Sequence, residues 1–187
     1  ETFDPASTVP FSVLFSSFMQ QSEEGSFRHL RRVVVRNAEL LVRNRKQLAF
    51  FDAKGFNFEL IRSKKGEIRI NNSASIHYKD FITNIYSEFS FGPDQPNIDG
   101  TVEFTELMPN ILAGLFFDDA DMKSFAVPIS GKITTSFDKQ GAPQYIGLDI
   151  QGEKGSIDSP RLATKLPITS LRVRGALSNN LHDLNLE

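Results

Sequence analysis

The chain contains no cysteine and no tryptophan, and no apolar run in it approaches the length of a membrane helix. The absence of cysteine excludes disulfides, thiolate metal sites and a cysteine nucleophile, but it leaves the compartment open, because an oxidising location tolerates a cysteine-free chain. A membrane-spanning helix needs about 20 apolar residues, so we expect no span in this segment. The 21 basic and 23 acidic residues give a net charge of −2. This charge does not indicate a nucleic-acid partner.

Recognisable catalytic motifs are also missing. Gly131-Lys132 resembles the end of a phosphate-binding loop, but Ile133 stands where that loop needs a hydroxyl. A cluster of three aspartates can either bind a hard cation or form a polar turn, and it lacks the glycine and distal glutamate of a calcium loop. The histidines lack metal-binding spacing. We therefore expect no enzyme activity, no metal site and no cofactor. The residues weighed here are Asp118, Asp119, Asp121, His29, His77 and His182.

Phenylalanine is abundant, with 17 residues against three tyrosines. A phenylalanine ring has no polar group and prefers an apolar environment. Either an ordinary core or an apolar groove can supply that environment, and composition does not separate the two.

Most of the chain alternates between apolar and polar residues with a period of two, which is typical of strands with one buried face. Turns are predicted at Lys64-Lys65-Gly66, at Asp99-Gly100 and at 138–141. Strands follow one another without helices between them, which favours an antiparallel meander over βαβ units. We expect a mainly β protein whose meander is curled into a trough or packed as a sandwich. The alternating apolar residues include Phe56, Phe58, Leu60, Ile68, Ile70, Phe89, Phe91, Phe104, Phe125, Val127, Ile129, Ile133, Ile146, Leu148 and Ile150.

Two short amphipathic helices are predicted, near residues 10–22 and 108–117, where apolar residues recur at i, i+3, i+4, i+7 and i+8. Strands are expected over 29–107 and 124–187. No linker divides the chain, so 1–187 is interpreted as a single β-rich domain or as a fragment of a larger, repeat-like β protein.

Basic residues concentrate between Arg28 and Lys46, where seven arginines and lysines accompany one acid. The segment from Asp80 to Met122 contains acids and no base. The basic segment has three interpretations. It is a solvated or internally paired strand, a contact for lipid headgroups, or a contact for nucleic acid, and the few interleaved aromatic residues disfavour the last.

The segment Leu30–Val42, with the sequence LRRVVVRNAELLV, resembles a motif of the AsmA-like superfamily of bacterial envelope proteins, in which an apolar strand ends in Asn-Ala. The segment Leu166–Gly175, with the sequence LPITSLRVRG, is similar to the repeated strand units of that superfamily. The segment Val127–Ile133 also resembles these strand units. The resemblance is strongest to the central region of YhdP-type members, relatives of TamB and AsmA, and identifies the chain as an internal periplasmic fragment.

The resemblance implies a protein anchored in the inner membrane and projecting into the periplasm, which binds or conducts phospholipid acyl chains toward the outer membrane. The alternating apolar residues named above then line the lipid groove. Arg31, Arg32 and Arg36 then contact headgroup phosphates at its rim. The implied partners are a phospholipid or another acyl-chain ligand and the remainder of the full-length protein. The alternative is a ligand-free structural or interaction β-domain of the cell envelope.

Overall fold

The chain divides into two compact units, Glu1–Arg31 and Arg32–Glu187. The computed structural model describes residues 31–44, 49–78, 80–111, 123–159, 164–178 and 183–186. The first unit is therefore described only at Arg31, and the helix predicted near 10–22 lies outside the described residues. Of the helix predicted near 108–117, residues 109–111 are helical and 112–117 are not described.

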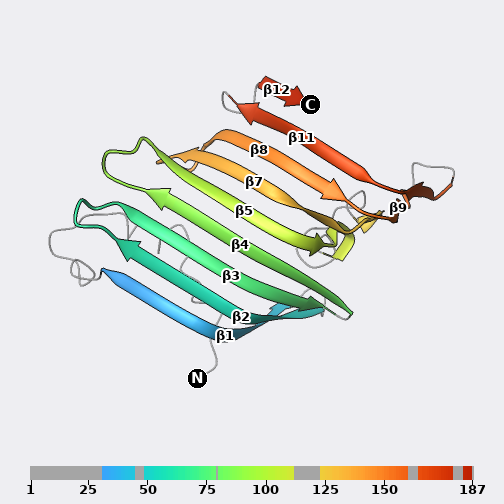
Figure 1. Ribbon diagram of the computed structural model, residues 1–187, viewed down its shortest axis with the longest axis horizontal. Helices are drawn as coiled ribbons and strands as arrows, with labels where there is room; N and C mark the ends of the chain where they lie inside the picture. Colours follow the sequence, from blue (N-terminus) through green and yellow to red (C-terminus); the bar gives the residue numbers. More distant parts are fainter. Residues whose placement is uncertain are drawn as a thin grey trace. The chain divides into compact units, whose positions relative to one another are not determined.

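The second unit is mainly β (Figure 1). Nine strands form one sheet in the order β1-β2-β3-β4-β5-β7-β8-β11-β12, and every neighbouring pair is antiparallel. A small sheet has the order β10-β9-β6. The strands of the large sheet are β1 (Arg32–Asn44), β2 (Ala49–Arg62), β3 (Ile68–Tyr78), β4 (Phe81–Phe91), β5 (Asn97–Leu107), β7 (Ile129–Asp138), β8 (Pro143–Gly152), β11 (Leu171–Ser178) and β12 (Asp183–Leu186). Those of the small sheet are β6 (Phe125–Ala126), β9 (Gly155–Ile157) and β10 (Leu166–Ile168).

The predicted meander is confirmed, because strand neighbours in the large sheet follow chain order except where the small-sheet strands intervene. The predicted curl into a trough or sandwich is wrong for these strands. The sheet is open, with β1 and β12 at its opposite ends. A sandwich needs a second large sheet, and the remaining described strands form only a three-stranded one.

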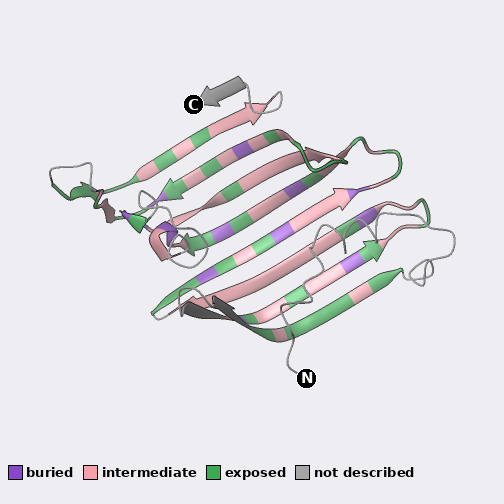
Figure 2. Ribbon diagram, turned by 180° about the vertical axis from the view of Figure 1, so that it is seen from behind, coloured by how far each residue is buried: buried purple, intermediate pink, exposed green. Residues whose placement is uncertain are grey.

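Burial alternates along the strands, as Figure 2 shows for β8 and β11. Few apolar side chains are fully enclosed, as expected for a sheet in one layer. Among the described residues, the buried hydrophobic side chains are Ala53, Leu60, Ile68, Phe91, Phe104, Met108 and Val127.

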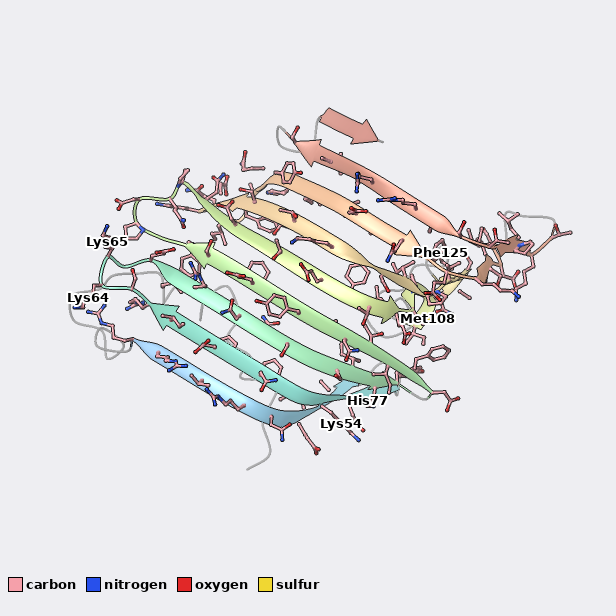
Figure 3. The ribbon with its side chains drawn as sticks, in the orientation of Figure 1. Lys54, Lys64, Lys65, His77, Met108 and Phe125 are labelled. Carbon is pink, nitrogen blue, oxygen red and sulfur yellow. The ribbon has the colours of Figure 1, made fainter. Side chains whose placement is uncertain are left out.

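Two of the predicted turns are confirmed, and the third is wrong. Lys64 and Lys65 form the β2–β3 turn, at the opposite end of these strands from Lys54 and His77 (Figure 3). The turn at 138–141 joins β7 to β8. Asp99-Gly100 instead lies inside β5, where the ring of Phe89 on the neighbouring strand covers the glycine.

The long alternating run from Phe125 to Phe137 is also divided in the structure. Phe125 belongs to β6 of the small sheet, and Pro128 separates it from β7 in the large sheet. Proline has no N–H for a strand ladder, so a break at this residue is expected. Phe125 and Met108, which follows β5, lie at the same end of the large sheet (Figure 3).

Candidate functional site

The strand register brings most of the predicted groove residues to one face of the large sheet, here called the apolar face. Directly paired residues of antiparallel strands share a face. The pairs Leu60–Ile70, Ile70–Phe89 and Ile133–Leu148 therefore connect distant strands on that surface. The predicted residues on it are Phe56, Phe58, Leu60, Ile68, Ile70, Phe89, Phe91, Phe104, Ile129, Ile133, Ile146, Leu148 and Ile150.

Most of these side chains are only half-buried, although Leu60, Ile68, Phe91 and Phe104 are buried. The other two predicted residues lie elsewhere. Phe125 is in the small sheet, and Val127 is fully buried where the chain passes from that sheet to β7.

Polar side chains interrupt the apolar face at a few points, among them the buried Thr83 and one hydrogen-bonded pair. Ser87 of β4 is buried opposite Asn72 of β3, and its hydroxyl donates a hydrogen bond of 2.8 Å to Asn72 Oδ1. Because both groups are satisfied, the pair avoids most of the cost of burying polar groups. The apolar face is therefore interrupted at this pair, and apolar side chains surround the pair.

The three arginines predicted to contact headgroups lie on or just before the edge strand β1. Arg32 is on the opposite, polar face, where its side chain forms an ion pair of 2.5 Å with Glu59 of β2. Arg36 lines a hollow on the same polar face, and Arg31 is exposed. The acid that pairs with Arg32 therefore comes from β2 and not from the acidic segment 80–122.

Three β-bulges lie on one line across the sheet. They contain Asn37 in β1, Gly55 in β2 and Glu106 in β5, which have positive φ values of 50°, 59° and 54°. The paired residues Ala74 and Ile85 continue the same line between β2 and β5. A bulge bends its strand and increases its twist.

Polar side chains support these bulges. Asn57 Oδ1 accepts a hydrogen bond of 3.0 Å from the backbone N–H of Asn37, and its Nδ2 donates to the carbonyl of Gly55 at 2.8 Å. The backbone N–H of Glu106 donates to Ser130 Oγ at 3.0 Å. Short polar side chains thus hold the backbone in its left-handed conformation.

The polar face is hollowed along this line. A groove of about 780 Å³ is lined by residues of β2, β3, β4, β5, β7, β8 and β11. A second hollow of about 310 Å³ lies over β1 to β4 and shares Asn57, Ser73 and Tyr86 with the first. We call the two together the polar groove. It crosses the strands rather than following them.

The charges of the larger hollow are balanced across strands. Lys132 Nζ lies 3.0 Å from Glu103 Oε1, its direct partner on β5. Asp149 of β8 has Arg172 and Arg174 of β11 at 4.0 and 2.8 Å. These side chains are about half exposed, and Arg172 more than half, so each pair contributes little stability.

Sequence reasoning missed the polar groove, because the bulges that form it have no signal of their own apart from Gly55. The sequence Asn71-Asn72-Ser73 matches the N-glycosylation pattern. In the structure this segment lies within β3, and the Oδ1 atom of Asn71 is buried without a hydrogen-bond partner. Such an asparagine is not a surface-loop acceptor.

The described residues contain neither a cluster of metal ligands nor a helix long and apolar enough to cross a membrane. No group of three or more potential metal ligands occurs among them. The three aspartates, His29 and His182 lie outside the described residues, and His77 is a strand residue of β3. No helix in the described part of the chain is long and apolar enough to cross a membrane.

Comparisons with known proteins find no matching family model, no similar curated protein and no similar solved structure.

Proposed function

We propose that this protein is a periplasmic segment of an AsmA-like envelope protein, and that its apolar sheet face binds phospholipid acyl chains. The observation that carries the proposal is that thirteen predicted apolar residues, drawn from six strands, meet on one face of an open sheet, where nine of them are only partly buried. Acyl chains have no polar groups, so an apolar surface of this kind suits them. Binding and movement of lipid along it need no catalytic residue.

The edge strands support the place of this segment in a longer protein. β1 has 13 residues and, among the described strands, is paired on one side only. The unpaired backbone groups of such an edge can accept a further strand of the same sheet. Anchoring in the inner membrane and projection into the periplasm rest on the sequence resemblance.

Two adjacent residues of β1 provide a matched test. Val35 is on the apolar face and 38% exposed, and Val34 is on the polar face and 40% exposed. An aspartate at either position stays hydrated, so neither change should unfold the protein. We expect Val35→Asp to lower the amount of bound lipid and Val34→Asp to leave it unchanged.

Lipid is measured by mass spectrometry of an organic extract of the purified protein, with a lipid-free β protein as control. Binding to vesicles of phosphatidylethanolamine and phosphatidylglycerol then compares the two variants. Equal binding by Val35→Asp and Val34→Asp, or an empty extract from folded wild-type protein, contradicts the proposal.

The second candidate is a ligand-free structural or interaction domain of the envelope. The buried pair of Ser87 and Asn72 favours it, because a hydrogen-bonded polar pair within the apolar face is typical of a surface that packs against protein. An empty extract together with a stable fold supports this alternative.

A further inference from the structure

The polar groove lies on the face opposite the proposed lipid surface, and the proposed function does not use it. Its larger hollow contains seven uncharged hydrogen-bonding side chains besides Tyr86, namely two asparagines, one glutamine, three serines and one threonine. Its ionised groups are two acids and two bases. Since these acids and bases are paired across strands, the larger hollow carries no net charge, whereas the second hollow adds Arg32, Arg36 and Glu59.

Tyr86 lies where the two hollows join, because it lines both of them. It projects from the middle of β4, and its side chain is 42% exposed. The Tyr86 hydroxyl and the Gln151 amide make no hydrogen bond within the described part of the chain, so both are available to a ligand.

We propose that the larger hollow of the polar groove binds a neutral polysaccharide chain that lies across the strands. A sugar ring has hydroxyls on its edge and C–H groups on its faces. The hydroxyls match the amide and hydroxyl side chains of the larger hollow. The C–H faces match an exposed aromatic ring.

The dimensions of the groove favour a chain over a single sugar. Neighbouring strands lie about 4.8 Å apart, so the seven strands from β2 to β11 that line the larger hollow span roughly 29 Å. The walls are side chains of one sheet face rather than a strand edge. An extended peptide therefore finds no backbone ladder to join, and the balanced charge offers no attraction to a polyanion.

The test uses the whole chain and three neutral probes, cellohexaose, maltohexaose and chitohexaose, with binding measured by saturation-transfer NMR. We expect saturable binding of at least one probe, with an affinity that is the same at about 0.05 and 0.5 M NaCl because no net charge is involved. Dextran sulfate serves as the polyanion and a glycine-serine peptide as the uncharged peptide.

Tyr86→Ala should weaken binding about tenfold, in line with the loss of an aromatic contact. The matched control is Tyr145→Ala, which removes a tyrosine that is 37% exposed on the same face and lies outside both hollows. Gln151→Ala, at an exposed position, should also weaken binding and provides a second variant if Tyr86→Ala does not fold.

Three results overturn the proposal. They are a failure of all three neutral probes to bind, equal losses in Tyr86→Ala and Tyr145→Ala, and a preference for dextran sulfate or the peptide over every neutral sugar.

Discussion

Gly131 of β7 should not tolerate even a methyl group. A Cβ atom at this position would lie 2.3 Å from the carbonyl oxygen of Asp149 and 2.9 Å from the Cα of Ile150, both in the backbone of β8. Contacts below 3.0 Å are essentially never seen for real Cβ atoms, so β7 and β8 must separate by at least 0.7 Å, the difference between 3.0 and 2.3 Å.

That separation lengthens the nearby hydrogen bonds between the strands from about 2.9 Å to roughly 3.6 Å, beyond the useful range. Losing two such bonds, with the strain of overpacking, should lower the free energy of unfolding of Gly131→Ala by about 3 kcal/mol. The measurement is urea unfolding followed by circular dichroism, with linear extrapolation to water.

Gly92→Ala is the control, because its Cβ would lie 3.4 Å from the nearest atom and its φ is not in the left-handed region. It should be neutral or more stable by about 0.4–1 kcal/mol, since alanine restricts the unfolded chain. If Gly131→Ala unfolds within about 0.5 kcal/mol of Gly92→Ala, the close approach of β7 and β8 is not as described and the reasoning fails.

Other substitutions test the bulges, the polar pair and the ion pairs. Asn57→Ala should speed hydrogen exchange of the Asn37 amide and lower the free energy of unfolding by about 1–2 kcal/mol. Unchanged exchange of the Asn37 amide would show that Asn57 does not stabilise the bulge. Ser87→Ala should cost about 1–3 kcal/mol in urea unfolding because Asn72 loses its donor. Changing Ser87 and Asn72 together to apolar residues should recover most of this loss, and a double variant less stable than Ser87→Ala would argue against that explanation. Lys132→Met should change stability by no more than about 1 kcal/mol at any salt concentration, because its ion pair is half exposed.

Local patterns were enough to predict the faces of the strands. A side chain in a strand points to the face opposite its neighbour's, so Phe58 and Leu60 share a face whatever strand lies beside them. The turn at 64–66 was equally local, because Gly66 takes the positive φ of 86° that the turn needs. The strand at Leu184 and Leu186 was expected from the same alternation and is present as β12.

Tertiary structure decided what the local patterns leave open. Gly100 carries the dipeptide signal of a turn, yet it lies in β5 because the ring of Phe89 takes the space that a side chain would occupy. The bulge at Asn37 depends on a hydrogen bond to Asn57, which is 20 residues away. The openness of the sheet and the groove on its polar face depend in turn on which strands meet and where the bulges align. Alternation is a property of one strand, whereas register, bulges and curvature belong to pairs of strands, and for that reason the sequence alone determined the two faces and the folded chain determined their shape.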